Sequence, residues 1–402
     1  MKFSTDFMKT ELAKDLLSPS DTQTADKILR ACVHCGFCLS ACPTYGILGD
    51  ELDSPRGRIY LIKQTLEGNA TSENSLKHLD RCLTCRSCET TCPSGVEYGH
   101  LLDIGRKVME QQSPRAWHQR IVRYALRSLL TSPKLFNFLI ALTPWNKHHN
   151  VNKKLQLQTE SQKDVLHSTK SVLLIAGCVQ PTLAPNINLS SKSVLYKLGY
   201  DVIETPQSQC CGAINHHLSG EDAALEQIKE NIDSWAAQLD QGAEAIISNA
   251  SGCGVMIKDY AHLLKDDENY AAKAKRIVEH TCDISEFLLN QDLSQFKKES
   301  NQKIVFQSPC TLQHGQKLPG RVEALLTDLG FTLSPVKDAH LCCGSAGTYS
   351  IFQKKLSYQL RDNKIQSLLK EAPEIIVTAN IGCLTHLQKG TSTPVKHWIE
   401  LL

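Results

Sequence analysis

Residues 32–43, CVHCGFCLSACP, and residues 82–93, CLTCRSCETTCP, share one pattern of four cysteines and a following proline, C-x2-C-x2-C-x3-C-P. In a run of this spacing, three thiolates bind one iron–sulfur cubane from a tight loop, and the fourth binds the cubane of the other run. A tetrahedral zinc site does not require a third cysteine at the same spacing. The two runs therefore predict two [4Fe-4S] clusters and one-electron chemistry, rather than a zinc site or disulfides.

The crossing of the fourth cysteine assigns each thiol to a cluster. The first cluster is predicted to bind Cys32, Cys35, Cys38 and Cys92, and the second Cys82, Cys85, Cys88 and Cys42. Between the runs, RIYLIKQTLEG and SLKHLDRC carry apolar residues at helical intervals. The first domain, residues 1–112, is therefore predicted to be mostly helical.

Arg56, Gly57 and Arg58 follow the first cysteine run closely. One interpretation is that they begin a helix and are solvated at the surface. The other is that their backbone donors and positive charge lie near the cluster sulfurs and raise the reduction potential. The sequence leaves both interpretations open.

Composition limits the class of protein. The chain has 402 residues, of which 41 % are apolar, enough for about two to three domains with real cores. A formal net charge of +2 makes nucleic acid a poor candidate partner. The N-terminus lacks an apolar signal segment, no stretch reaches transmembrane length, and 17 cysteines favour a reducing compartment. We therefore expect a cytoplasmic protein.

A basic segment follows at residues 113–168. From Gln111 to Thr159 there is no Asp or Glu. Aromatic residues, among them Trp117 and Trp145, and aliphatic residues at helical spacing indicate basic amphipathic helices. The segment is either a helical linker packed on the chain's own domains or a docking surface for anionic lipid headgroups or an acidic partner. The cations of the acid-free stretch from Gln111 to Thr159 are Arg115, Arg120, Arg123, Arg127, Lys134, Lys147, Lys153 and Lys154.

The remaining chain is an internal repeat, residues 169–298 and 299–402. Strand-like runs alternate with helix-like runs in the same order in both halves, which predicts parallel α/β units with cysteines converging at the carboxyl edge of each sheet. The glycine after each cysteine pair permits a tight turn there. The repeated cysteines are Cys178, Cys210, Cys211 and Cys253 in the first half and Cys310, Cys342, Cys343 and Cys383 in the second.

Several roles fit this second cysteine set. Four thiols in each half can bind a further iron–sulfur cluster or zinc, or one pair can cycle through a disulfide. They can also be small apolar core residues, although two superposable patterns argue against coincidence. Cys282 fits neither pattern and is predicted to be a plain buried thiol.

On five motifs the chain resembles the iron–sulfur subunits of bacterial glycolate oxidase (glycolate dehydrogenase): CVHCGFCLSACPTY, GDELDSPRGRIYLIKQ, HLDRCLTCRSCETTCPSGV, HLCCGSAGTYS and VTANIGC. The wider family, which includes heterodisulfide reductase and anaerobic glycerol-3-phosphate dehydrogenase subunits, joins a two-cluster ferredoxin domain to two cysteine-rich CCG domains. The resemblance thus implies an α+β multidomain fold: an N-terminal α-helical two-[4Fe-4S] ferredoxin domain and two repeated α/β CCG domains.

The resemblance also implies a complex. FAD-containing partner subunits would oxidise glycolate to glyoxylate, and this chain would pass the electrons towards the quinone pool, peripherally at the cytoplasmic face of the inner membrane. The sequence shows no dinucleotide, phosphate-binding or nucleophile-elbow motif, so we assign it no catalytic residue. A lactate or glycerol-3-phosphate donor, and a cluster-based redox-sensing scaffold, stay open as alternatives.

One departure from the family concerns the repeats. Heterodisulfide reductase has a further cysteine where this chain has Ala250 and Asn380. Four thiols in each half still suffice for an ordinary cluster, but the non-cubane cluster of that enzyme is not expected here.

Overall fold

The computed structural model describes residues 8–142, 152–165, 168–205 and 210–402. Trp145 and Lys147 of the basic segment, and the N-terminal residues 1–7, lie outside these ranges. The chain divides into two compact units, Met1–Arg120 with Asp338–Lys364, and Ile121–Lys337 with Ile365–Leu402. This division differs from the four domains expected, because residues 338–364 of the second repeat belong to the N-terminal unit.

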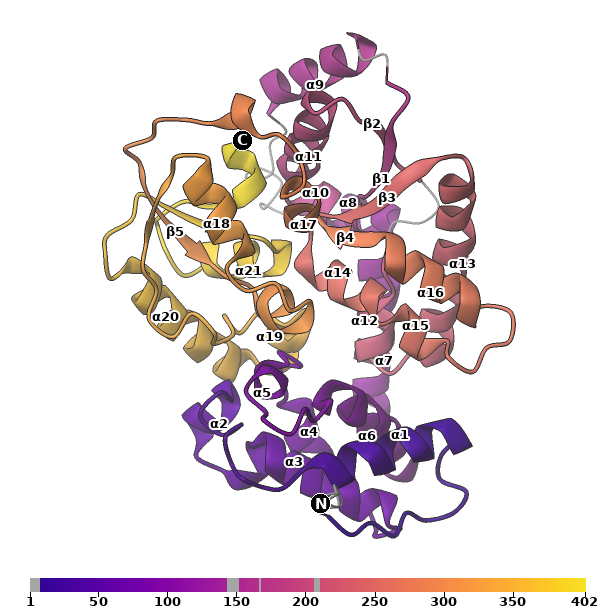
Figure 1. Cartoon of the computed structure of the whole chain (residues 1–402). Coiled ribbons are helices and arrows are strands. Elements are labelled where there is room, and N and C mark those ends of the chain that lie inside the picture. Colours follow the sequence, from indigo (N-terminus) through magenta and orange to yellow (C-terminus); the bar gives the residue numbers. More distant parts are fainter. Residues whose placement is uncertain (1–7, 143–151, 166–167, 206–209) are drawn as a thin grey trace, which may run out of the picture. The chain divides into compact units, whose positions relative to one another are not determined.

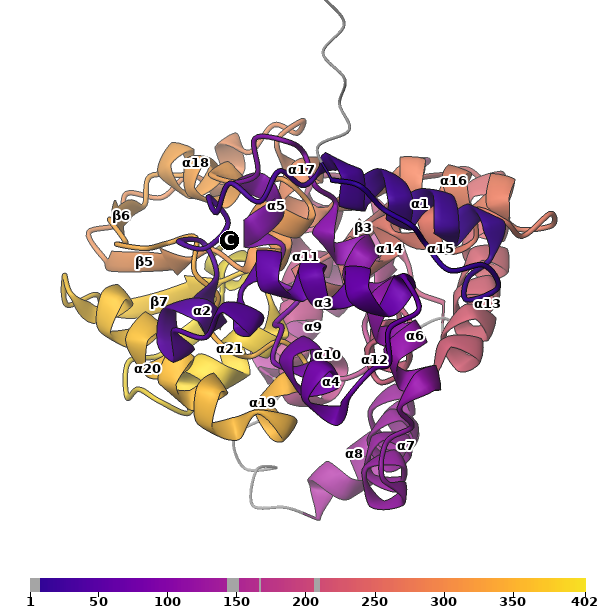
Figure 2. The ribbon, with the colours of Figure 1, turned by 90° about the horizontal axis from the view of Figure 1, so that it is seen from below.

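The N-terminal unit is built of helices, as its sequence predicts (Figure 2). Its first part contains α1 (Pro19–Ala31), α2 (Pro43–Leu48), η1 (Glu51–Asp53), α3 (Pro55–Leu66), α4 (Glu73–Asp80), α5 (Ser87–Thr90) and α6 (Tyr98–Gln112). The segment from the second repeat adds α19 (Tyr349–Phe352) and the start of α20 (Lys354–Leu369). Helix α7 (Trp117–Thr131) crosses the boundary between the units.

Serine caps fix where three of these helices begin. Ser18, Ser54 and Ser72 precede α1, α3 and α4, and each side-chain oxygen accepts a backbone N–H three residues on. Such a cap satisfies one of the unpaired donors of the first helical turn. Proline at the first position of α1 and α3 supplies a φ already suited to a helix. The helix starts are therefore encoded locally.

The core of this unit lies between α3 and α6. A side chain at Gly105 of α6 would place its Cβ 2.5 Å from Ile62 of α3, so glycine allows the two helices to pack closely. The buried residues around this contact are Leu29, Leu66, Leu79, Leu101, Leu102 and Met109. This packing holds the loops that carry the eight ferredoxin-type cysteines.

The second unit contains two parallel four-stranded sheets (Figure 1). The first has the order β2-β1-β3-β4 and the second β6-β5-β7-β8, so the two halves repeat one topology. The fourth strand of each sheet is an addition to the three that the sequence predicts. The strands are β1 (Ser171–Ile175), β2 (Asp201–Ile203), β3 (Ala243–Ser248), β4 (Thr281–Asp283), β5 (Lys303–Gln307), β6 (Thr332–Ser334), β7 (Ile375–Thr378) and β8 (Val395–His397).

Helices connect the parallel strands, as crossover connections require. In the register of the central pairs, Leu174 lies opposite Ile247 and Val305 opposite Ile376. The first half contains α10 (Gln180–Leu183), α11 (Pro185–Lys197), α12 (Ala213–His217), α13 (Glu221–Asp240), α14 (Ser251–Lys258), α15 (Tyr260–Leu263), α16 (Ala271–His280) and α17 (Ile284–Leu288). The second half contains η3 (Ser294–Phe296), η4 (Thr311–Gly315), α18 (Arg321–Asp328), α21 (Ile381–Gln388) and η5 (Trp398–Leu401).

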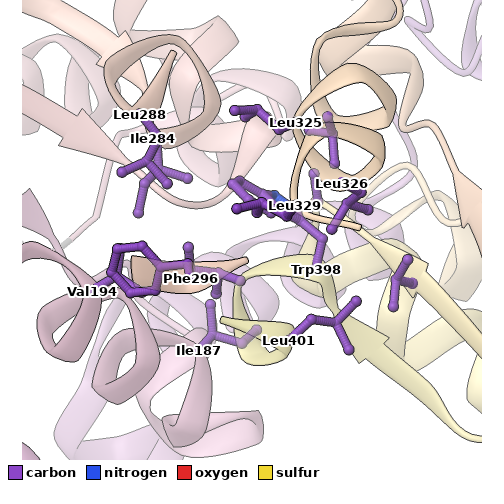
Figure 3. Packing of buried hydrophobic residues seen from close by; sticks show 14 of the residues in the cluster. Ile187, Val194, Ile284, Leu288, Phe296, Leu325, Leu326, Leu329, Trp398 and Leu401 are labelled. Atoms are coloured by element: carbon purple, nitrogen blue, oxygen red, sulfur yellow. The ribbon is translucent and has the colours of Figure 1, made fainter. Parts of the chain in front are cut away.

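The two halves share one hydrophobic core. Figure 3 shows Ile187 and Val194 of α11 and Ile284 of α17 together with Leu326 of α18 and Trp398 of η5. Residues from both sheets belong to this cluster, so each repeat covers apolar surface of the other. The repeats therefore form one unit rather than two separately folded domains.

The described parts of the basic segment form helices, as predicted: α7, α8 (Pro133–Ala141) and α9 (Lys153–Val165). Helix α7 has no buried residue, and α8 has one, Phe136. Among the described residues, none of the helices combines the length and apolarity needed to cross a bilayer.

Candidate metal centres

The two cysteine runs adopt the same unusual backbone. In the first run, His34 and Gly36 have positive φ, 53° and 85°, and in the second run Thr84 and Arg86 have φ of 52° and 57°. Left-handed residues at equivalent positions turn backbone N–H groups inward, the arrangement that forms anion-binding concavities in iron–sulfur sites. The Thr84 N–H donates to Cys82 Sγ at 3.4 Å. Three of these residues are not glycine, so the loops keep a strained conformation that suits a cluster.

The first group of thiols surrounds one cavity. Cys32 caps the end of α1, Cys35 and Cys38 lie in the following loop, and Cys92 follows α5. All four line this cavity together with His34, Phe37 and Arg56. Cys35 and Phe37 are exposed, so one wall of the cavity reaches the surface.

The second group surrounds a neighbouring cavity. Cys42, at the start of α2, lines it with Cys82, Cys85 and Cys88 of the other run. The geometry thus brings together both groups that the ferredoxin rule assigns, with the fourth cysteine of each run at the opposite cavity. Cys88 and Tyr98 line both cavities, so the two sites adjoin.

The donor chemistry of these sites fits iron. Burial raises the pKa of Cys38 to about 11 and also raises the pKa values of Cys32 and Cys88. Cysteine ligands must be deprotonated, and bound cations supply the charge that keeps buried thiolates ionised. Each site has four converging thiols on loops with inward N–H groups, which suits a [4Fe-4S] cluster. Two such clusters would supply one-electron chemistry.

Side chains outside the cysteine runs reach the second site. Arg58 of α3 is 1 % exposed, so the interpretation of Arg58 as a solvated surface residue is wrong. Its Nη1 donates to Cys42 Sγ at 3.9 Å. The Tyr98 hydroxyl donates to Cys82 Sγ at 3.6 Å. Sequence reasoning missed Tyr98, whose only signal is its position six residues after the second run.

The first repeat also gathers its four cysteines. Cys178 follows β1, Cys210 and Cys211 lie in the connection after β2, and Cys253 lies on α14 after β3, at the carboxyl edge of the sheet. Hydrogen bonds from the thiols of Cys178 and Cys211 lower the pKa of Cys210. Cys211 also contacts Cys253, and these bonds together with burial raise the pKa of Cys211. The predicted convergence therefore holds in this half.

Second-repeat cysteines are divided between the units. Cys342 and Cys343 lie in Asp338–Lys364 of the N-terminal unit, whereas Cys310, before η4, and Cys383, on α21, lie in the second unit. Gly344 has a positive φ of 86°, like Gly212 in the first repeat. Convergence of these four thiols stays a prediction. Cys282 lies on β4, where partial burial raises its pKa to about 12. It is half-buried, whereas the sequence predicts a buried thiol.

Family models match both parts of the chain. A 4Fe-4S dicluster domain matches residues 28–96, and a cysteine-rich domain, CCG, matches residues 172–258 and 304–388. Together with the two adjoining thiol sites, this defines an iron–sulfur protein of the electron-transfer class, which binds two [4Fe-4S] clusters and has an α+β multidomain fold.

Whole-chain comparison is more specific. The chain is 48 % identical to the glycolate oxidase iron-sulfur subunit of Escherichia coli (strain K12), over 98 % of both chains. It is 31 % identical to the probable glycolate oxidase iron-sulfur subunit of Bacillus subtilis (strain 168), over 89 % of this chain and 88 % of the other. Lactate utilization protein A of Anoxybacillus flavithermus is 28 % identical over 58 % of this chain. The chain belongs to the family of glycolate oxidase iron–sulfur subunits.

Proposed function

We propose that this chain carries electrons from a partner flavoprotein, which oxidises glycolate to glyoxylate, to a quinone-type acceptor. The observation that carries the proposal is the pair of adjoining thiol sites, which share Cys88 and Tyr98. Adjacent clusters pass single electrons, while the two-electron oxidation of a hydroxy acid belongs to a flavin. The choice of glycolate rests on the family to which the chain belongs.

The proposed ligand sets are supported by the lining of the two cavities. Cys32, Cys35, Cys38 and Cys92 hold the first cluster, and Cys42, Cys82, Cys85 and Cys88 hold the second. Supporting this assignment, each cavity is lined by three cysteines of one run and the fourth cysteine of the other, and Cys88 of the second run lines both cavities. The shared wall at Cys88 supports two clusters that lie next to each other.

The test uses the chain purified with its flavoprotein partners. Glycolate is expected to drive reduction of a soluble quinone analogue, and lactate and glycerol 3-phosphate are expected to be poor donors. Cys35→Ala should abolish quinone reduction, whereas Cys282→Ala, which alters a half-buried thiol outside both cluster sites, should leave it unchanged. Full quinone reduction without the clusters, or equal rates with lactate, would contradict the proposal.

We further propose that Cys178, Cys210, Cys211 and Cys253 bind a metal, either a further iron–sulfur cluster or zinc. Supporting this, the four thiols are linked by hydrogen bonds, and the Tyr260 hydroxyl donates to the Cys211 carbonyl at 2.9 Å, which fixes the loop. Metal analysis of anaerobically purified protein tests this. Metal beyond about eight irons per chain, lost in Cys211→Ala but kept in Cys282→Ala, is expected; no metal beyond the two clusters refutes it.

For location, we propose that α7 and α8 bind an anionic membrane surface (Figure 2). Tyr124, Phe138 and Leu142 are 63 %, 62 % and 69 % exposed. No acidic residue occurs from Gln111 to Thr159, the stretch that contains both helices and the cations around these apolar side chains. Basic amphipathic helices with exposed aromatic residues bind anionic lipid through apolar burial and charge together.

Cosedimentation with vesicles tests the membrane proposal. The protein should bind vesicles that contain phosphatidylglycerol and should not bind phosphatidylcholine alone. Reversal of Arg120, Arg123 and Arg127 to Glu should abolish binding. As a matched control, replacement of three exposed lysines elsewhere by Glu should leave vesicle binding intact. These lysines are Lys27, Lys275 and Lys355. Unchanged vesicle binding with loss of the flavoprotein partners would instead identify an acidic protein as the occupant.

A further inference from the structure

A buried charge network lies beside the second cluster site. Asp53, at the end of η1, is fully buried and contacts three basic side chains. Its carboxylate lies 2.7 Å from Arg81 Nη1, 3.1 Å from His78 Nδ1 and 3.3 Å from Arg58 Nη2. Two guanidinium groups face the buried Asp53 carboxylate, and the exposed Asp50 carboxylate lies within 4.8 Å of Asp53 and His78. Of these groups, Arg58 is buried where little water can screen its charge.

Arg58 is fixed so that it faces the cluster ligand. Its Nε donates to the His78 carbonyl at 2.8 Å, and its Nη2 donates to Thr44 Oγ1 at 3.1 Å. These bonds, with Asp53, leave Nη1 directed at Cys42 Sγ, 3.9 Å away. The rigid planar guanidinium of arginine makes this orientation possible. A lysine would reproduce the positive charge but not the fixed set of hydrogen bonds.

The first site lacks an equivalent group among the described residues. Arg56 lines that cavity, but its side chain is 33 % exposed and pairs one-to-one with Glu51 at 2.5 Å. Solvent and this carboxylate screen its charge. The donors to Cys32 and Cys38 are backbone groups, those of His34 and Arg56. Among the described residues, the two sites therefore differ in that a buried cationic side chain donates to a sulfur ligand at the second site only.

Reduction adds one electron to a cluster that is already negatively charged. Hydrogen bonds to the sulfur ligands and nearby positive charge stabilise the reduced state more than the oxidised state, which raises the potential. We propose that Arg58, held by Asp53, donates a charge-assisted hydrogen bond to Cys42 and raises the potential of the second cluster, so that the electron settles there rather than on the first. This inference rests on the proposed two-cluster ligand sets.

A redox titration followed by EPR tests the role of Arg58 in the full chain with its clusters. Dithionite and mediators set the potential, so glycolate is not needed, and failure of the glycolate proposal would not affect the result. In Arg58→Gln, the ratio of reduced to oxidised second cluster at a fixed potential is expected to fall about tenfold, equivalent to about 59 mV for a one-electron couple. Arg58→Lys should recover most of this loss, and Arg56→Gln should leave the second cluster unchanged.

A second variant predicts the opposite sign. Asp53→Asn keeps the hydrogen-bonding shape but removes the countercharge, so the second cluster should become easier to reduce. Iron content and thermal unfolding are measured for each variant, because a purely structural role of Arg58 would lower these without moving the midpoint. If Arg58→Gln fails to retain its clusters, the midpoint potentials of the second cluster in Asp53→Asn and Arg58→Lys test the proposal instead. Wild-type midpoints in iron-replete Arg58→Gln, or in Asp53→Asn, would overturn the proposal.

Discussion

Pairs of cysteine substitutions distinguish the crossed ligand sets from two self-contained runs. Cys42 lines the cavity of the second run and Cys92 that of the first. In the crossed arrangement, Cys35 and Cys92 serve one cluster, so replacing both by alanine removes one cluster only. Cys35 and Cys42 serve different clusters, so the double variant loses both. If each run were self-contained, these two outcomes would be exchanged.

The expected magnitudes can be counted. The two ferredoxin-type clusters should supply about eight irons in wild type, about four in the Cys35→Ala/Cys92→Ala protein and about none in the Cys35→Ala/Cys42→Ala protein. Iron bound at the first-repeat cysteines would add the same amount to every protein. Iron analysis gives the iron content, and EPR spin counts after dithionite reduction give the number of cubane clusters. Three-iron products are paramagnetic when oxidised and are counted as lost cubanes. A fourth protein, Cys42→Ala/Cys85→Ala, should match the first double variant. Retention of one cubane in Cys35→Ala/Cys42→Ala would refute the crossed assignment.

Three further predictions concern stability. Burial lowers the pKa of His397 to about 3, so the stability that its neutral form contributes is full above pH 6.5 and is lost as pH falls towards 3. Between pH 7 and pH 5, the free energy of unfolding should therefore fall by about 2 kcal/mol more in wild type than in His397→Gln. Urea denaturation at the two pH values measures this difference. A steeper fall in the variant would contradict this. Gly57→Ala should lower the free energy of unfolding by about 1–3 kcal/mol, because the added Cβ would lie 2.0 Å from the Glu51 carbonyl oxygen. Equal thermal stability of the variant and wild type would refute this prediction. Arg115→Met should cost about 3 kcal/mol, because it leaves Asp80 without a two-pronged partner at 2.6 and 2.8 Å; the double variant with Asp80→Asn should recover part of the loss.

Much of the fold could be predicted because its signals are local. The cysteine spacing, the serine-capped helices and the apolar strand runs each lie within a few residues, and the repeat doubles the evidence for the parallel sheets. The fourth strands β4 and β8 escaped prediction because polar residues such as Asp283 and Lys396 interrupt them and no motif marks their place in the repeat. The equally short β2 and β6 are predictable from their place between a helix and the cysteine pair in both repeats.

The surroundings of the second site could not be predicted for a different reason. A buried Arg58 and a solvated one look the same in sequence, and only the tertiary fold brings Asp53, His78 and Arg81 around it. The membership of residues 338–364 in the N-terminal unit likewise depends on contacts between distant segments. Long-range packing decides both features, and neither has a local pattern.

The most direct test of the electron-carrying role is anaerobic. The complex with its flavoprotein partners is mixed with glycolate, frozen within one turnover, and examined by EPR. Reduced-cluster signals that appear with glycolate as fast as the acceptor is reduced, but not with lactate, are the predicted result. Clusters that dithionite reduces but glycolate does not, while the partner flavin is reduced, would contradict it.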